Sequence, residues 1–304
     1  MISVLSGGVG AARLLMALRT HVPDQELEAI VNVGDDLVLN GLTICPDLDT
    51  ITYTLAGLNN EVTGWGLAGE TWRVMDELES LGGANWFRLG DRDLATHLYR
   101  SQRLAEGATK SQVARELAER HGLNVALLPV SDDPLATVLD TAVGELSFQE
   151  YFVAHRHAVA VHSIRVEGAA LAVPAPGVLA SLDSATRIVI APSNPLLSIE
   201  PILSVAAVRD RLATRCRDVL AVSPIVGGVA LKGPADRLLT QMGYPATCVG
   251  VAQYYRGLVG TLVIDEVDAA HADAVRETGM DCVVTTTIMA DPANAARLAQ
   301  VVAT

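Results

Sequence analysis

Hydrophobic and polar positions alternate along the first fifty residues in a pattern that predicts a strand, a helix and a second strand. The apolar run Ile2–Leu5 leads into the glycine-rich segment Ser6–Gly10, and Ala11–Leu18 has the composition and spacing of a helix. A polar turn at Pro23-Asp24 separates this helix from a second apolar run, Leu27–Val33. A strand, a crossover helix and another strand form a βαβ unit, which implies a parallel sheet.

The C-terminal part of the chain repeats this alternation. Its apolar runs, each followed by a polar segment, are Arg187–Ile190, Val219–Val222, Leu262–Ile264 and Asp281–Thr285. A final helix is predicted at about Pro292–Val302. We therefore expect an α/β fold, with a Rossmann-like parallel sheet core built from residues 1–50 plus 184–304.

Residues 51–183 have a different pattern and are expected to form an inserted helical and small-β subdomain within a single functional unit. The helices predicted in and next to its first part are Asp49–Leu58, Thr71–Leu81, Asp93–Ala105 and Ser111–His121. Ser111 is the expected N-cap of the last of these, because a serine side chain accepts hydrogen bonds from free N–H groups of a first helical turn. From Thr137 to Val173 the pattern becomes strand-like.

Composition and charge narrow the class of protein. The 22 Lys and Arg residues against 35 Asp and Glu residues give a net charge of −13, which argues against a nucleic-acid-binding protein, since phosphate backbones require clustered cations. A hydrophobic content of 50% excludes disorder for most of the chain. The four cysteines form no C-x-x-C pair, and neither a basic leader nor an apolar run of membrane-spanning length is found. We expect a cytoplasmic protein with no membrane partner.

The glycine-rich segment after the first strand is the first candidate binding site. Its residues Gly7, Gly8 and Gly10 let backbone N–H groups at a helix N-terminus approach a phosphate. Tight packing of the turn is the alternative explanation. Arg13 stands where a dinucleotide-binding pattern has its third glycine, and no Gly-Lys-Ser/Thr completes a Walker loop. Arg13 is therefore interpreted as an anion contact or a surface charge.

Four carboxylates follow the second strand within fifteen positions, at Asp35, Asp36, Asp47 and Asp49. Carboxylate oxygens beside a candidate phosphate loop suit a hard cation such as Mg²⁺. The alternative is that they serve turns and cap the helix that begins near Thr50.

The run Arg88–Asp93 alternates arginine and aspartate and is followed by Thr96 and His97. Such a run is usually a solvated helix start whose charges cancel. Because this one stands in an apolar neighbourhood, a role facing a ligand is the competing interpretation.

A proline-containing loop follows the strand at Arg187–Ile190. Ser193 and Asn194 in this loop, with Ser198 beyond it, offer donors for a phosphate or a base, or else the loop is a proline-stiffened turn. Lys232, which follows a later strand and its glycines, is a weaker phosphate candidate.

Six of these segments together resemble the 2-phospho-L-lactate transferase family, whose members act in the biosynthesis of the deazaflavin coenzyme F-420. In chain order the segments are Ser6–Gly10, Val31–Asp36, Pro46–Thr50, Leu89–His97, Phe148–Glu150 and Ala191–Pro195. They span essentially the whole chain. Val9 stands where archaeal members often have threonine. In this respect the chain is closer to the actinobacterial form of the family.

The resemblance implies a transferase that acts on two small molecules. The acceptor is Fo, a deazaflavin with a ribityl chain, and the donor is a guanylylated three-carbon phospho-acid. The acid is lactate, phosphoenolpyruvate or glycerate. The terminal hydroxyl of Fo attacks the phosphorus that carries the acid, and GMP leaves. The resemblance also implies that Mg²⁺ is required and that the protein is a homodimer.

The same resemblance assigns roles to individual residues. Asp35 and Asp49 are the metal ligands and catalytic residues expected for this chemistry. The resemblance matches Asp49 and Arg88 to positions that contact Fo, and Asp91 is expected to join them. The implied contacts for the donor's phosphates and guanosine are Gly7, Gly8, Gly10, Arg13, Ser193, Asn194 and Ser198.

Two other functions remain open on sequence alone. An NAD(P)-dependent oxidoreductase is one, since Asp35 or Asp36 lies near the position of a ribose-binding acid, although Arg13 in the third-glycine position speaks against it. A nucleotide-sugar-binding regulator on the same fold is the other. It would bind its ligand without turning over Fo, and the run from Arg88 to His97 would have no purpose.

Overall fold

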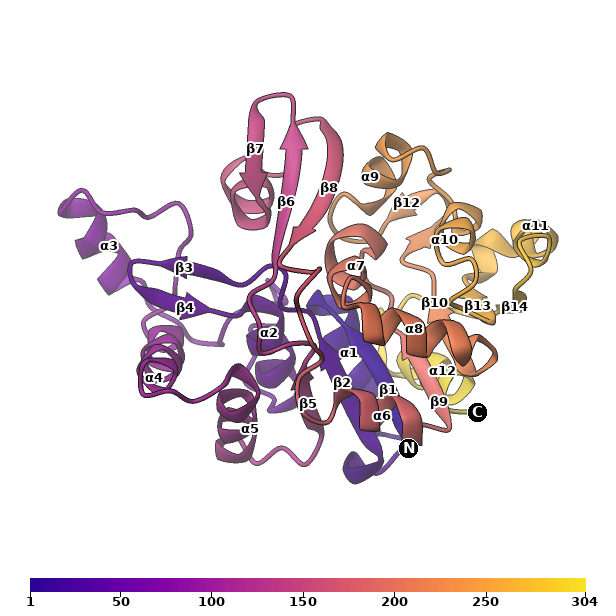
Figure 1. Ribbon diagram of the computed structural model, residues 1–304, viewed down its shortest axis with the longest axis horizontal. Coiled ribbons are helices and arrows are strands. Elements are labelled where there is room, and N and C mark those ends of the chain that lie inside the picture. The colour runs from indigo at the N-terminus through magenta and orange to yellow at the C-terminus, as the bar shows by residue number, and fades with distance from the viewer.

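A seven-stranded, fully parallel sheet forms the centre of the computed structural model, which describes residues 1–304 (Figure 1). In spatial order its strands are β14 (Asp281–Val284), β13 (Thr261–Ile264), β10 (Val219–Val222), β9 (Arg187–Ile190), β1 (Ile2–Ser6), β2 (Leu27–Val31) and β5 (Ala126–Pro129). Every residue of β1 is buried, as expected for a central parallel strand with helices on both faces. The expected Rossmann-like α/β core is confirmed.

The chain leaves β1 toward one edge of the sheet and returns on its other side. It passes from β1 to β2 and β5, whereas β9, β10, β13 and β14 follow one another toward the opposite edge. Right-handed crossovers then place the connecting helices on opposite faces. Accordingly, α1 (Gly8–Leu18) packs with α2 (Pro46–Leu55) and α12 (Pro292–Ala303), and α6 (Val178–Ser184) packs with α8 (Ala206–Thr214). The gap between the loops after β1 and β9 is the topological switch point, where ligands bind in such sheets.

Two appendages project from this core (Figure 1). The first, which we call the arm, contains the hairpin of β3 (Leu37–Leu39) and β4 (Leu42–Ile44) together with α3 (Arg73–Ser80). It has its own small apolar cluster of Ile44, Met75 and Leu89. The second is an antiparallel sheet with the strand order β7 (Gly144–Ser147), β6 (Ala136–Thr141) and β8 (Val161–Glu167).

The remaining elements surround the sheet and its carboxyl edge. They are α4 (Asp93–Ala105), α5 (Lys110–Arg120), α7 (Glu200–Leu203), α9 (Ala235–Gln241), α10 (Cys248–Tyr254), α11 (Ala272–Arg276) and the hairpin of β11 (Ile225–Val226) and β12 (Val229–Ala230). Short helical turns lie at Asp24–Glu26, Glu150–Ala154, Pro195–Ile199, Cys216–Asp218 and Glu266–His271. No helix is both long and apolar enough to cross a membrane.

The structure differs from the sequence-based expectation in the range 51–183. β5 lies inside this range, yet it pairs in parallel with β2 and forms the outer strand of the central sheet. α2 begins at Pro46 rather than near Asp49, because proline is well suited to the first turn of a helix. Both differences matter for the carboxylates described below.

The N-cap expected for α5 at Ser111 is wrong. Thr109 caps this helix: its hydroxyl accepts from the Gln112 N–H, and the Gln112 side chain accepts from the Thr109 N–H. Ser111 instead donates its N–H and its hydroxyl to Asp132, at 2.7 and 2.8 Å. A reciprocal capping box satisfies two helix N–H donors at once, which is why it prevails over a lone serine.

Candidate active site

The glycine turn between β1 and α1 is pressed between two other segments. The Gly8 N–H donates to Asp47 Oδ1 at 2.7 Å, and Gly8 has a φ of +69°. A Cβ on Gly7 would lie 2.7 Å from Ser198 Cβ, and one on Gly10 would meet the Pro192 carbonyl oxygen. The turn therefore needs glycine because α2 and the loop after β9 approach its backbone closely. Tight packing is thus part of the explanation of this motif.

The predicted donor-binding loop after β9 lies directly against the glycine turn. The Ser193 hydroxyl donates to the Gly7 carbonyl at 2.7 Å. Asn194 Oδ1 accepts from the N–H groups of Leu196 and Leu197, which caps the helical turn that contains Ser198. The structure brings all these predicted residues together. The Ser193 hydroxyl and the Asn194 side-chain oxygen shape the loop.

Two buried carboxylates meet at a shared amide between β2 and α2. Asn32 Nδ2 donates to Asp47 Oδ2 at 2.9 Å and to Asp35 Oδ1 at 3.2 Å. Asn32 Oδ1 in turn accepts from the Gly34 N–H at 2.8 Å, which fixes the amide. Gln149, from the motif before the turn Glu150–Ala154, donates to the Asp35 carbonyl at 3.1 Å. Neither carboxylate has a cationic partner within 4 Å.

The electrostatics of this pair are unfavourable to ionisation. Burial raises the pKa of Asp35 well above its usual range, and the neighbouring charges of Asp47 and Asp36 raise it further. Burial raises the pKa of Asp47 to about 7, against hydrogen bonds from Asn32 and Gly8 that lower it. Two carboxylates that share one neutral donor in a dry site compete for charge. The pair therefore favours a cation or a proton between them.

The other two aspartates of the cluster each have a basic partner. Asp36 pairs with Lys110 Nζ at 2.7 Å, at the start of α5. The Asp49 carboxylate accepts hydrogen bonds from both terminal nitrogens of Arg100 on α4, from Nη1 at 3.1 Å. Arg100 and Asp49 are almost fully buried, with 3% and 6% of their surfaces exposed. These charges are compensated within the protein.

His97 extends the Asp49–Arg100 pair along α4. Its Nδ1 lies 3.7 Å from Asp49 Oδ2, and its Nε2 lies 3.2 Å from Asp93 Oδ2. The Tyr53 hydroxyl, on α2, donates to Asp93 Oδ1 at 2.6 Å. Asp93 and His97, at the end of the predicted run, therefore join α4 to α2 and are not part of a solvated helix start.

The geometry separates Asp47 from Asp49. Residues two apart in a helix project about 200° apart around its axis, so Asp47 faces the glycine turn and Asp49 faces α4. The predicted metal ligands Asp35 and Asp49 are thus not the pair that the Asn32 amide joins. No group of three or more His, Cys, Asp or Glu side chains is arranged around a common point. A cation here would need further oxygen atoms from a substrate or water, as Mg²⁺ sites commonly do.

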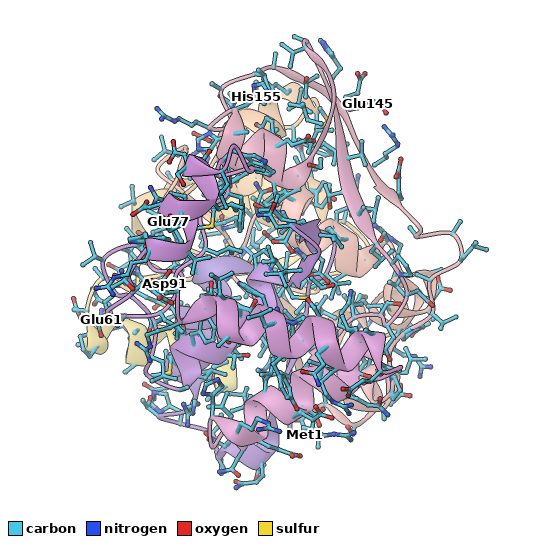
Figure 2. The ribbon with its side chains drawn as sticks, turned by 90° about the vertical axis from the view of Figure 1, so that its left-hand side faces the viewer. Met1, Glu61, Glu77, Asp91, Glu145 and His155 are labelled. Carbon is cyan, nitrogen blue, oxygen red and sulfur yellow. The ribbon has the colours of Figure 1, made fainter.

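Of the predicted Fo contacts, Asp91 lies next to α3 of the arm (Figure 2), and Arg88 pairs with Asp76 on the same helix. Asp91 accepts from the Thr71 hydroxyl and from the N–H groups of Arg73 and Val74, at 3.2 and 3.1 Å for the two N–H groups, and so fixes the start of α3. Arg88 is exposed, pairs with Asp76 and lies 5.4 Å above the Trp72 ring. Glu70 accepts from the Asp93 N–H and holds the start of α4. Arg88 remains accessible to a ligand, whereas every hydrogen bond of the Asp91 carboxylate is made with the segment 71–74.

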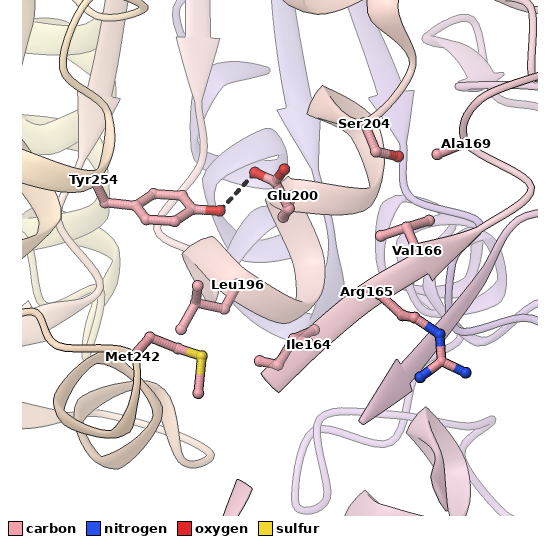
Figure 3. Close-up of a pocket in the computed structure, with 9 residues that line it drawn as sticks. All are labelled: Ile164, Arg165, Val166, Ala169, Leu196, Glu200, Ser204, Met242 and Tyr254. Carbon is pink, nitrogen blue, oxygen red and sulfur yellow. Dashed lines mark hydrogen bonds between the residues drawn. The ribbon is translucent and has the colours of Figure 1, made fainter. Parts of the chain in front are cut away.

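A cavity of about 330 Å³, separate from these carboxylates, lies between α7, β8 and α10 (Figure 3). Its polar wall is Glu200, which accepts from the Tyr254 hydroxyl at 2.5 Å and pairs with Arg209. Because these polar groups satisfy one another and the other walls are mostly apolar, the cavity offers little chemistry. The carboxylate cluster at the switch point is the stronger candidate for an active site.

Three residues of the site were not assigned by sequence reasoning: Asn32, Arg100 and Lys110. Asn32 lies inside the recognised run that follows β2, so its position was visible but its role was not. Arg100 follows His97 by three residues on a predicted helix, a spacing that places both on one face. Lys110 had no local signal, since its partner Asp36 lies 74 positions earlier in the chain.

Comparison with known proteins identifies the family of this chain. The family model of 2-phospho-L-lactate transferase CofD matches residues 2–300. A phosphoenolpyruvate transferase of Streptomyces griseus is 44% identical over 95% of this chain and 93% of its own length. Proteins of the same name from Streptomyces coelicolor and Nocardia farcinica are 41% and 39% identical, each over 98% of this chain and over 96% and 92% of their own lengths.

Solved structures support the fold at much lower sequence identity. Two crystal structures of protein BH3568 from Bacillus halodurans, a member of the UPF0052 family, superpose with TM-scores of 0.65 and 0.62 at 15% identity. They cover 100% of this chain and 99% and 98% of the other. The family model that matches residues 2–300, with relatives that are 39–44% identical over nearly the whole chain, shows that this chain belongs to the 2-phospho-L-lactate transferase CofD family.

Proposed function

We propose that this enzyme transfers a phosphoenolpyruvate-type group from a guanosine diphosphate ester to the deazaflavin Fo, in the biosynthesis of coenzyme F-420. The family match supports a transferase of the F-420 pathway, and the relatives with about 40% identity are named phosphoenolpyruvate transferases. These names favour phosphoenolpyruvate over lactate or glycerate as the acid of the donor.

One observation carries the proposal: Asp35 and Asp47 are buried without a cation beside the glycine turn. Phosphoryl transfer depends mainly on positioning and on neutralising charge that spreads over phosphate oxygens. A cluster with surplus negative charge, next to a glycine turn whose N–H groups can bind phosphate, suits a divalent cation that is also bound by the substrate. The same cluster is poorly suited to bind a phosphate without a cation.

The residues present fit Mg²⁺. We propose that Asp35 and Asp47 hold it, and that Asp49, which the resemblance assigns to this role, contributes only if its ion pair with Arg100 opens. When bound, the ion supplies positive charge that polarises the phosphorus under attack. Asn32 orients the two carboxylates toward one another, and Lys110 and Arg100 keep Asp36 and Asp49 from adding to the negative charge.

The chain's other residues bind and orient the two substrates. The N–H groups of Val9 and Gly10 belong to the first turn of α1, where N–H groups have no partner within the helix and can bind phosphate oxygens. Arg13, Ser193, Asn194 and Ser198 are proposed to surround the rest of the donor. Arg88 and Asp91 are proposed to contact Fo from the arm. In the reaction the oxygen of the ribityl hydroxyl bonds to the acid-bearing phosphorus, the bond from that phosphorus to the oxygen of GMP breaks, and the hydroxyl proton is released.

A direct assay tests the proposal. Purified protein, Fo and Mg²⁺ are incubated with equal amounts of the three guanylylated acids, and the products are identified by mass spectrometry. The expected product is the phosphoenolpyruvate diester of Fo, with one GMP released per diester. Absence of turnover with all three donors would contradict the proposal, and nucleotide-sugar binding in the same preparation would then favour the regulator.

The homodimer implied by the resemblance and the cytoplasmic location expected from the sequence stay predictions. Analytical ultracentrifugation of the purified protein measures the first, and fractionation of the source cells measures the second.

A further inference from the structure

Lys232 lies against the glycine turn although it is more than 200 residues away in sequence. It belongs to the segment between β12 and α9. A Cβ placed on Gly64 would lie 3.0 Å from Lys232 Nζ and 3.1 Å from Val9 Cγ1, so the ammonium group and the Val9 side chain border the same glycine. Gly64 has a φ of +79°, a conformation that glycine adopts readily. The Gly64 backbone thus leaves room for the Lys232 ammonium group beside the first turn of α1.

Arg13 is the second cation at this place. It is exposed on α1, one turn beyond Val9. Burial lowers the pKa of Lys232, and the charge of Arg13 lowers it further. Neither has a carboxylate within 4 Å, although the chain carries 35 acidic residues.

The segment that carries Lys232 packs against an aromatic side chain, and the Lys232 side chain itself is exposed. A Cβ on the next residue, Gly233, would lie 3.5 Å from Phe152 Cε2, so this segment packs against the aromatic side chain. Phe152 itself stacks on Phe148, with ring centroids 5.4 Å apart. Lys232 and Arg13 form a local excess of positive charge in a protein with a net charge of −13. An anion bound between them would offset their mutual repulsion.

We infer that Lys232 is a substrate-binding residue that, together with Arg13, holds the diphosphate of the guanylylated donor over the glycine turn. This inference rests on the proposed function. It adds a residue that no motif of the family resemblance contains. The donor site is then formed by α1, the loop around Gly64 and the segment before α9. Asp35 and Asp47 then act on the donor from the α2 side of the turn, while Arg13 acts from α1 and Lys232 from beside Gly64.

Binding of GDP and of inorganic pyrophosphate, measured by isothermal titration calorimetry in the presence of Mg²⁺, tests the inference. Lys232→Gln is expected to weaken both by about tenfold, the scale of one charge-assisted hydrogen bond. Lys232→Arg should retain most of the affinity because it keeps the charge. Gly64→Ala should weaken both ligands as well, since its methyl group would displace the ammonium group. In turnover, Lys232→Gln should raise the KM for the donor and leave the KM for Fo unchanged.

Arg256→Gln is the matched control. Arg256 is also exposed and unpaired, but it precedes β13 and so lies at the amino edge of the sheet, away from the switch point. Equal affinity of wild type and Lys232→Gln for GDP, a matching loss in Arg256→Gln, or no binding of GDP or pyrophosphate to wild type would each overturn the inference. A wild-type protein that binds GDP but never modifies Fo would instead contradict the proposed function, because the binding comparison requires no turnover.

Discussion

The two halves of the aspartate cluster differ in how their charge is compensated. Asp36 and Asp49 each bind a basic side chain from α5 or α4, whereas Asp35 and Asp47 share only the neutral Asn32 amide. All of these carboxylates come from one short stretch of sequence. The difference separates structural from functional carboxylates, because an uncompensated buried charge costs stability and such costs concentrate at functional sites.

The two halves also connect different parts of the molecule. In the paired half, Asp36 and Asp49, the first joins the turn after β2 to α5 and the second joins α2 to α4. α4 in turn contacts β4 of the arm, where the acceptor is proposed to bind. In the unpaired half, Asp35 and Asp47, the Asp47 carboxylate joins α2 to the glycine turn, where the donor is proposed to bind. The first turn of α2 thus contacts both the glycine turn and α4 through side chains only two positions apart.

Removal of the cation from the paired half should have the largest effect. Arg100→Met leaves the Asp49 charge buried without a partner, and breaking a buried ion pair in this way typically costs about 3–5 kcal/mol. We expect the free energy of unfolding, measured by urea denaturation, to fall by that amount. Arg256→Met, which removes an exposed and unpaired arginine, serves as control and should change it by less than about 0.5 kcal/mol. Equal stability of Arg100→Met and wild type would show that the pair is not a structural link.

Removal of a charge from the unpaired half should affect activity and not stability. Asp35→Asn keeps the shape of the side chain and ends its repulsion with Asp47, so the melting temperature in the absence of Mg²⁺ should stay equal or rise. The rate of diester formation should fall by about 10²–10³, the scale of a removed electrostatic contact to a transition state. Asp281→Asn, at the exposed amino end of β14, is the matched control. A destabilised but fully active Asp35→Asn protein would reverse the proposed roles of the two halves.

The sequence was sufficient to predict the fold and the neighbourhood of the site. Glycine and aspartate runs that follow apolar strands had to gather at one edge, because parallel strands end on the same side of a sheet. The sequence was not sufficient to pair the aspartates. α2 was expected to begin near Asp49, which left Asp47 in a loop, whereas the helix begins at Pro46 and sends the two side chains to opposite sides.

Long-range partners account for most of the remaining differences. Lys110 reaches Asp36, and β5 joins β2, through contacts that leave no periodic trace in the local sequence. His97 and Arg100 are a different case. With Asp93 they follow the i, i+4 and i+3 spacings of one helix face, so their alignment was visible in the sequence while their target, Asp49, was not.

The pH dependence of stability offers the finest test of the same comparison. The pKa of Asp47 is raised to about 7 in the folded protein, mainly by burial, and is about 3.9 in an unfolded chain. Between these values the folded state binds a proton that the unfolded state does not, so stability decreases as the pH rises. Without Mg²⁺ the protein should therefore melt a few degrees lower at pH 8 than at pH 6.

Asp47→Asn should flatten this dependence of the melting temperature on pH, since an amide does not titrate. Added Mg²⁺ should raise the melting temperature more at pH 8, where the carboxylates are charged. The carboxyl groups with lowered pKa, such as Asp93, lose their contribution only well below pH 4 and do not enter this window. A slope that is the same in wild type and Asp47→Asn would mean that the unpaired half is not charged as the structure indicates.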